Sequence, residues 1–361
     1  MKDILRDLIA VLEGGGTAAL ARVVEVSGAV PREPGAAMIV PADGPVVGSL
    51  SGGCVEAAVI ETAREVLAIG LCVSERFGID DGIAPGLTCG GEIEVVTEHI
   101  GAERFPLLRE LRSALVAGEP MGLVSTLSGI PDWALVRAGE PAPWPQIEGD
   151  IVSLIRAGRS AVAGADRCEP DQSDLPRVFV QAFAAPPRMI LAGANAFVRA
   201  LSRTGSQLGY RVTVVDAREV FATPAHFPYA VPYADEVVVD WPHRYLRAEA
   251  AGGRVDARTV VCVLTHDPKF DVPMLAAALT VAPVAFVGAL GSRRTHTDRM
   301  ARLREQGVTD DQLGRLRSPL GLDLNARTPE ETAISIAAQI IAETSGGSGR
   351  PLSDIDGPIH R

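Results

Sequence analysis

The sequence predicts an α/β protein of two domains, the second built on a doubly wound parallel sheet. Its 361 residues are enough for two separate hydrophobic cores. In the second half, short apolar segments alternate with stretches of helical length, which is typical of parallel strands joined by right-handed crossover helices. The strands of this sheet are expected at residues 188–192, 211–216, 236–240, 259–264 and 284–287.

The helices of the second half are expected between these strands and after the last of them. Two of them span residues 272–279 and 292–306. A third begins at Thr328, because this N-cap residue is followed by Pro329 at the first helical position and by Glu331 three residues after the cap.

The first half has a different pattern, so it is expected to form an α/β domain of its own. Residues 19–28 and 91–97 alternate apolar and polar side chains, as half-buried strands do, and residues 55–68 have helical spacing. Residues 101–185 should add one helix and two or three strands. The break at Ala185–Pro186–Pro187 marks the boundary. We therefore expect domains at 1–185 and 186–345, and a flexible tail rich in Gly, Ser and Pro at 346–361.

Composition and charge exclude several classes of function. Hydrophobic residues make up 47% and charged residues 22% of the chain, and the formal net charge is −11. An acidic surface repels nucleic acids and anionic membranes, so neither is expected as a partner. The uncharged stretch Val272–Ser292 is interrupted by Pro273, Pro283 and Gly288, and the first residues form a charged amphipathic helix rather than a signal peptide. Five widely spaced cysteines favour a reducing cytoplasm over a disulfide framework.

The most informative motif of the first half is the glycine-rich segment Gly48–Glu56. A glycine turn that leads into a helix collects backbone N–H groups around one point, where the helix dipole favours an anion or a thiolate. Cys54 lies in the first turn, so its thiol pKa should be depressed. Cys89 precedes a second Gly-Gly pair, which suggests a shared pocket. The alternative is two ordinary turns and two buried cysteines. The expected ligand contacts are Ser51, Gly52, Gly53, Glu56, Gly90 and Gly91.

The turn after the first strand of the second half resembles a dinucleotide-binding turn only in part. Gly193 stands where such a fingerprint begins, but Asn195 and Val198 replace its second and third glycines. Asp216 ends the next strand and is placed to bond a ribose hydroxyl. The segment therefore predicts the fold more strongly than it predicts NAD(P), and a scaffold without a dinucleotide remains the alternative.

Two further loops follow strands at the carboxyl edge of the sheet, where open α/β sheets bind ligands. The segment 265–271 gathers an imidazole, two carboxylates and an ammonium group, and the segment 288–294 brings glycines and a hydroxyl to a helix N-terminus before two arginines. Solvated loops are the alternative for both, and no spacing predicts a metal site. The expected contacts are Thr265, His266, Asp267, Lys269, Gly288, Gly291, Ser292 and Arg293.

Together these motifs resemble the XdhC/CoxI family of accessory proteins for xanthine dehydrogenase and carbon monoxide dehydrogenase. The matching blocks are 48–56, 89–94, 209–218, 221–228, 265–271, 288–294, 319–323 and 328–331. The Gly193 loop is similar to the CoxI-like branch, which lacks the complete glycine pattern of other members. The resemblance implies a Rossmann-like second domain.

The resemblance also implies a function. Such proteins hold the molybdenum cofactor (molybdopterin), support exchange of its oxo ligand for a sulfido ligand, and pass it to an apo molybdenum hydroxylase, with a separate sulfur donor. It implies Cys54 and Cys89 as the residues on the sulfur or metal side. A homodimer is a further expectation.

Two rival functions stay open. One is an NAD(P)-dependent oxidoreductase that uses Asp216 for ribose and His266 for proton transfer. The other is a redox or metal-sensing module in which Cys54 and Cys89 form a reversible disulfide. An accessory protein is favoured over a stand-alone enzyme.

Overall fold

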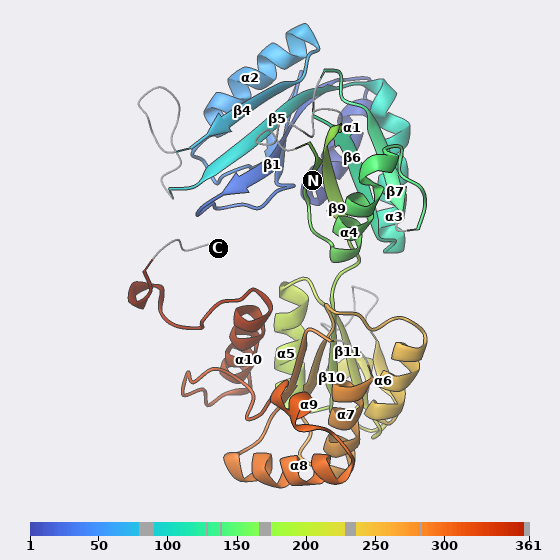
Figure 1. Cartoon of the computed structure of the whole chain (residues 1–361), viewed down its shortest axis with the longest axis vertical. Helices are drawn as coiled ribbons and strands as arrows, with labels where there is room; N and C mark the ends of the chain where they lie inside the picture. Colours follow the sequence, from blue (N-terminus) through green and yellow to red (C-terminus); the bar gives the residue numbers. More distant parts are fainter. Residues whose placement is uncertain are drawn as a thin grey trace. The chain divides into compact units, whose positions relative to one another are not determined.

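The computed structural model describes residues 1–78, 90–127, 129–137, 139–165, 175–227, 236–281 and 284–356. The chain forms two compact units, one of residues Met1–Ala185 with Asp356–Arg361 and one of residues Pro186–Ile355. Each unit has its own sheets and helices (Figure 1). No helix in the described residues is long and apolar enough to cross a membrane.

The first unit contains a five-stranded antiparallel sheet. Its strands lie in the order β3 (Val47–Gly48), β2 (Ala37–Pro41), β1 (Ala18–Ser27), β5 (Glu92–Ile100) and β4 (Val73–Phe77). Helix α1 (Leu5–Glu13) packs with Leu20 on one face, whereas α2 (Glu56–Ile69) packs with Ala21 and Val23 on the other. Because both faces are covered, β1 is buried continuously from Ala18 to Val24, and the prediction of a half-buried strand was wrong there.

A second sheet completes this unit and was predicted only in part. Its strands lie in the order β7 (Trp133–Arg137), β6 (Met121–Thr126), β9 (Arg177–Phe183) and β8 (Ala161–Gly164), all antiparallel. Helix α3 (Phe105–Ala117) packs on one face and α4 (Glu148–Ala157) on the other. The expectation of one helix and two or three strands was therefore too low, because the edge strand β8 has only four residues.

The second unit is a six-stranded, wholly parallel sheet, which confirms the predicted fold class. The strands lie in the order β12 (Val237–Val239), β11 (Arg211–Asp216), β10 (Arg188–Ala192), β13 (Val260–Val263), β14 (Phe286–Ala289) and β15 (Leu316–Arg317). The order reverses direction between β10 and β13, as in Rossmann folds, so the carboxyl ends of these strands form the expected ligand edge.

Helices cover both faces of this sheet (Figure 1). Helices α5 (Ala196–Gln207) and α10 (Pro329–Thr344) pack on one face. Helices α6 (Pro242–Ala251), α7 (Pro268–Thr280), α8 (Arg293–Glu305) and α9 (Asp310–Gly314) pack on the other. Short 3₁₀ turns lie at Lys2–Ile4, Ala102–Arg104, Pro145–Ile147, Pro224–His226 and Leu352–Asp354. The last of these turns falls within the expected tail.

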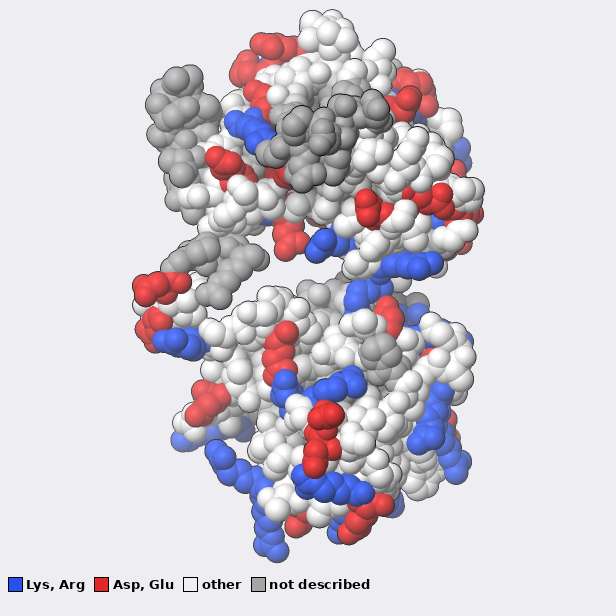
Figure 2. Space-filling view, viewed as in Figure 1, with Lys and Arg blue, Asp and Glu red and all other residues white. Residues whose placement is uncertain are grey.

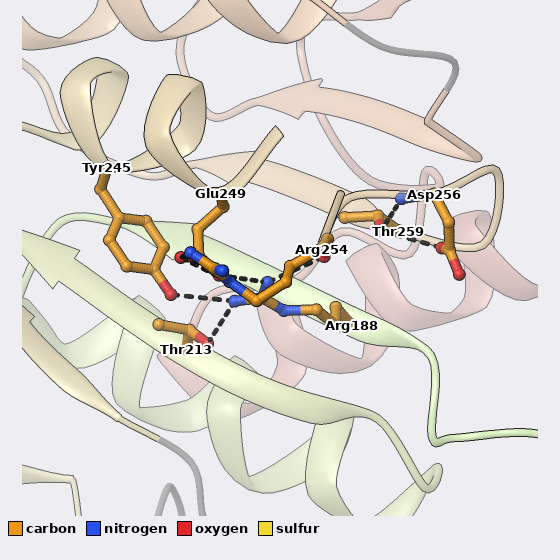
Figure 3. A network of polar contacts seen from close by, with 7 residues as sticks. All are labelled: Arg188, Thr213, Tyr245, Glu249, Arg254, Asp256 and Thr259. Atoms are coloured by element: carbon orange, nitrogen blue, oxygen red, sulfur yellow. Dashed lines mark hydrogen bonds and ion pairs between the residues drawn. The ribbon is translucent and has the colours of Figure 1, made fainter. Parts of the chain in front are cut away.

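A polar network closes the amino edge of the parallel sheet (Figure 3). Arg188, at the start of β10, donates to Glu249 at 2.6 Å and to the hydroxyl of Tyr245 at 2.9 Å, both on α6. Arg254 binds the same Glu249 carboxylate at 2.7 Å. A half-buried arginine with these partners fixes α6 against the sheet. The network is structural and lies at the edge opposite to the expected ligand edge.

Candidate functional site

The glycine-rich segment before α2 wraps around the carboxylate of Glu56. Seven hydrogen bonds reach this side chain from residues that precede it in the loop or at the helix start. Oε1 accepts from the N–H groups of Leu50 (3.1 Å), Ser51 (2.9 Å) and Gly52 (3.0 Å) and from the hydroxyl of Ser49 (2.8 Å). Oε2 accepts from the N–H groups of Gly53 (2.9 Å) and Val55 (3.2 Å) and from the Ser51 hydroxyl (2.7 Å).

The amides expected to hold a ligand's anion are therefore occupied by an anion of the chain itself. Partial burial raises the pKa of Glu56, but the hydrogen bonds from Ser51 and Ser49 outweigh it and hold that pKa far below its ordinary value. Gly52 and Gly53 have φ angles of +84° and +125°, which lets the backbone curl around the carboxylate. A phosphate would have to displace Glu56 to reach these N–H groups.

Cys54 lies beside this loop and is half-buried. Its N–H donates to the Ser51 hydroxyl at 3.1 Å, and its side chain packs against the apolar cluster under α2 that includes Val59. The loop thus fixes the position of the Cys54 backbone. Cys89 lies outside the described residues, so the predicted pairing of the two cysteines stays a prediction.

The second Gly-Gly pair has a packing reason. A Cβ on Gly91 would lie 2.3 Å from the carbonyl oxygen of Ala29 and 2.7 Å from that of Ser27, so only glycine fits where β5 approaches this turn. Gly90 is exposed, with a φ of +79° and open space around its Cα. Close backbone approach explains Gly91 without a ligand, and Gly90 stays a predicted contact.

In the second unit, the loop after β10 is closed by a side chain. Gly193 has a φ of +119°, and its N–H donates to the carbonyl oxygen of Val215. Asn195 caps α5 by accepting from the N–H of Val198 at 3.1 Å, and its amide donates to the carbonyl oxygen of Leu264 at 2.7 Å. Asn195 therefore satisfies a helix N–H that a dinucleotide pyrophosphate would otherwise bind.

Asp216 is buried at the end of β11, and its acceptors are also in use. Its Oδ1 accepts from the N–H and Nε of Arg218 at 2.8 and 2.9 Å, and its Oδ2 accepts from Nη2 at 2.6 Å. These hydrogen bonds raise the pKa of Arg218, whose guanidinium also lies over the ring of Phe221. A ribose hydroxyl would have to compete with a bidentate ion pair.

The loop after β13 is shorter than predicted. Asp267 is the N-cap of α7 and accepts from the N–H of Lys269 at 3.0 Å, so residues 268–271 form the first helical turn. The ammonium of Lys269 lies 3.5 Å from the Asp267 carboxylate, and both side chains are exposed, as is His266. Thr265 is buried and donates to the carboxylate of Asp271.

Arg299 on α8 is a buried residue that the sequence reasoning missed. Its Nη2 donates to Asp271 at 2.9 Å and to the carbonyl oxygen of Leu290 at 3.0 Å, and its Nη1 donates to Ser318 at 2.9 Å. It therefore joins the first turn of α7 to the loops that follow β14 and β15. Burial raises the pKa of Asp271, and the hydrogen bonds from Thr265 and Arg299 oppose that shift. Arg299 lies eleven residues after Gly288, and this spacing matches no motif that would have predicted its role.

The loop after β14 has mixed roles. A Cβ on Gly288 would lie 2.4 Å from Leu320, so this glycine serves packing. Ser292 caps α8 by accepting from the N–H of Thr295 at 3.1 Å, as expected of a hydroxyl at a helix start. Gly291 lies in the turn before that cap. Arg293 is the exposed first residue of the helix.

Each unit contains a cavity, and His266 is the predicted contact among the residues that line them. In the second unit, a cavity of about 160 Å³ lies between α7 and α8 and is lined by His266, Arg294 and Arg302 among others. In the first unit, a cavity of about 410 Å³ lies beside β8 and is lined by Glu25, Asp150, Arg159, Arg177 and residues 161–165 among others. The described residues hold no group of three or more His, Cys, Asp and Glu side chains arranged for a metal ion.

Comparison with known proteins identifies the family. The sequence model described as "XdhC and CoxI family" matches residues 11–78, and the one described as "XdhC Rossmann domain" matches residues 189–340. The chain belongs to the XdhC/CoxI family. The first match includes the loop around Glu56, and the second includes Arg299 and the cavity between α7 and α8.

Similar proteins extend over nearly the whole length of this XdhC/CoxI chain. The molybdenum cofactor insertion chaperone PaoD of Escherichia coli is 28% identical over 346 residues, which are 94% of this chain and 87% of PaoD. A protein of Bacillus subtilis, named as a probable xanthine dehydrogenase subunit, is 29% identical, and the match covers 92% of this chain and 95% of that protein. A crystal structure described as a xanthine dehydrogenase from Bacillus halodurans superposes with a TM-score of 0.66 at 26% identity, covering 97% of this chain and 98% of that one.

Proposed function

We propose that this chain is a molybdenum cofactor chaperone, which binds the cofactor and inserts it into a molybdenum hydroxylase of the xanthine dehydrogenase type. The observation that carries the proposal is the similarity to PaoD, because it includes both units and leaves no large part of either chain unmatched. The cofactor is cargo here, so the chain needs to bind it reversibly rather than perform chemistry on a substrate.

The described residues include the chemical groups that would bind such a cargo. The molybdenum of the cofactor is a soft centre that tolerates thiolate neighbours, and Cys54 offers a half-buried thiol at a rigid position. The phosphate of molybdopterin requires cationic side chains. Arg294 and Arg302 supply them in the second unit, and Arg159 supplies one in the first, where Arg177 is already paired with Glu25 and Glu94.

We further propose that sulfuration takes place while the cofactor is bound. The exchange replaces an oxo ligand with a sulfido ligand of the same charge, so it releases the oxygen as water and needs sulfur at the sulfide level with two protons from a donor protein. Cys54 is the proposed residue on this side, with Cys89 as its partner. We also propose that the chain forms a homodimer, as expected from the sequence.

The NAD(P)-dependent alternative is not favoured by the geometry. It needs an open helix N-terminus after Gly193 and an available Asp216 carboxylate. Asn195 already caps that helix, and Arg218 already binds that carboxylate. A dinucleotide would have to break both sets of hydrogen bonds.

A transfer assay tests the proposed function. The purified chain is loaded with molybdenum cofactor and mixed with an apo molybdenum hydroxylase, and recovered activity is measured with and without a sulfur donor. We expect faster and more complete activation than with cofactor alone, and a loss of cofactor from the chain that equals the gain in the enzyme. Activation at the same rate and to the same extent without the chain would contradict the proposal. A matched arm with Cys54→Ala tests the thiol, since equal cofactor retention would remove Cys54 from the site.

A further inference from the structure

The cavity between α7 and α8 is small, and cationic groups surround it. Its volume is about 160 Å³. Residues 294, 295, 298, 299 and 302 line it from α8, and this spacing places them on one face of the helix. His266 and the first turn of α7 line the other side.

The charges around the cavity do not cancel. Arg299 is neutralised by Asp271 at 2.9 Å, and both are buried. Arg294 and Arg302 form no ion pair with any residue in the described part of the chain, and Asp298 is the one other acid in the lining. The neighbouring Arg304, by contrast, is paired with Asp310 at 3.0 Å. The cavity therefore keeps a net positive charge.

This positive charge stands out in an acidic protein. The segment 1–185 contains 14 Lys and Arg against 26 Asp and Glu, whereas the segment 186–355 contains 19 against 18. Figure 2 shows several Lys and Arg side chains on the surface at the place where Figure 1 draws α8. Arg294 and Arg302 line the cavity from the same helix without an acidic partner among the residues described, and a bound anion would neutralise their charge.

Two helix N-termini add to the potential. Helix α7 begins at Pro268 and α8 at Arg293, and both follow parallel strands, so their amide ends lie at the carboxyl edge of the sheet. The cavity lining includes residues of the first turn of each helix, namely Pro268 and Arg294. The dipoles of both helices therefore favour an anion at the end of the cavity where Arg294 lies, whereas Arg302 lines the cavity from the last turn of α8.

We infer that this cavity binds the phosphate of a phosphomonoester, with Arg294 and Arg302 as its charged contacts and His266 as a further hydrogen-bonding group. The volume suits a phosphate group and is too small for a whole nucleotide or pterin, since pockets for drug-sized ligands start at about 300 Å³. The rest of the ester extends out of the cavity. Naming that ester as the molybdenum cofactor rests on the proposed function, whereas the phosphate site itself does not.

Calorimetric titration of the full chain with inorganic phosphate and pyrophosphate tests the site. We expect binding by the wild type, a loss of affinity of roughly ten-fold for each of Arg294→Gln and Arg302→Gln, and about a hundred-fold loss for the double variant. Arg304→Gln is the matched control on the same helix and should bind as the wild type does. The exposed positions predict unchanged thermal unfolding for all variants. No phosphate binding by the wild type, or equal binding by the double variant, would overturn the inference.

A second set of measurements, of molybdenum cofactor binding by the same variants, tests separately whether the phosphomonoester is that cofactor. Loss of both phosphate and cofactor binding in the double variant supports the full assignment. If the double variant loses phosphate binding but retains cofactor normally, the phosphomonoester is not the cofactor, while the proposed function stands. Phosphate binding by a wild type that fails to bind cofactor leaves the site intact and refutes the proposed function.

Discussion

Replacement of Glu56 by alanine should destabilise the protein more than the loss of an ordinary surface carboxylate. Leu50 and Ser51 are buried, so their N–H groups lose their acceptor without gaining water, whereas the N–H of Val55 keeps the Ser51 hydroxyl as an acceptor at 3.2 Å. Gly52 and Gly53 are exposed, and water replaces the carboxylate there. At about 1.5 kcal/mol for each of these two buried donors, Glu56→Ala should lower the free energy of unfolding by about 3 kcal/mol.

Glutamine at this position is not conservative. Both carboxylate oxygens of Glu56 accept from N–H groups, so one of them becomes an NH₂ group that faces donors. We expect a loss of about 2 kcal/mol for Glu56→Gln. Glu61→Gln is the matched control, because Glu61 lies on the same helix with its side chain exposed.

The pH dependence has a definite sign. The folded pKa of Glu56 lies below its ordinary value of 4.5, so the carboxylate stabilises the fold fully above that value, and the stabilisation is lost as the pH falls toward the folded pKa. Urea unfolding between pH 7 and about pH 3 measures this. The difference between wild type and Glu56→Gln should be constant above about pH 5 and should shrink below about pH 4. A Glu56→Gln protein as stable as Glu61→Gln at pH 7, or a difference that grows in acid, would refute the reasoning.

Three other predictions follow from close contacts in each unit. Gly91→Ala should lower the free energy of unfolding by about 3 kcal/mol or more, because the added Cβ would meet a carbonyl oxygen. Gly90→Ala should lower it by about 1 kcal/mol, because only the positive φ opposes alanine there. Similar urea midpoints for the two variants would contradict this prediction. Arg299→Met leaves Asp271 buried without its partner and should cost about 3–5 kcal/mol, and thermal unfolding within a degree of the wild type would count against it. Titrations with NAD and NADP should be flat for both wild type and Asp216→Ala, and binding that the substitution weakens would restore the oxidoreductase hypothesis.

The parallel sheet could be predicted from sequence because its signals are local. Apolar runs such as Arg188–Ala192 and Val260–Val263 are short and separated by helices of regular spacing, and Thr328 makes the predicted capping box with Glu331. The second sheet of the first unit was underestimated, because the edge strand β8 is a four-residue segment of small residues without clear periodicity.

The functional sites were harder to predict from sequence, because the hydrogen-bond partners of a polar side chain depend on the three-dimensional fold. The sequence indicated that the amides of Gly52 and Gly53 gather around an anion, but it could not show that the anion is Glu56. Asp216 looked available for a ribose until its neighbour Arg218 was seen to bind it. Arg302 lies nine residues from the predicted Arg293 and shares its helix, yet only the packing of α7 against α8 places Arg302 at the cavity.

The most direct measurement of the central claim is the small-molecule content of the protein itself. The chain is purified from cells that make molybdenum cofactor and from cells that cannot, and then denatured, and the released pterin and molybdenum are quantified. The account predicts pterin and molybdenum in equal amounts from the first preparation and neither from the second. A protein that releases no pterin from cofactor-producing cells, and takes none up when loaded in vitro, would contradict the chaperone function.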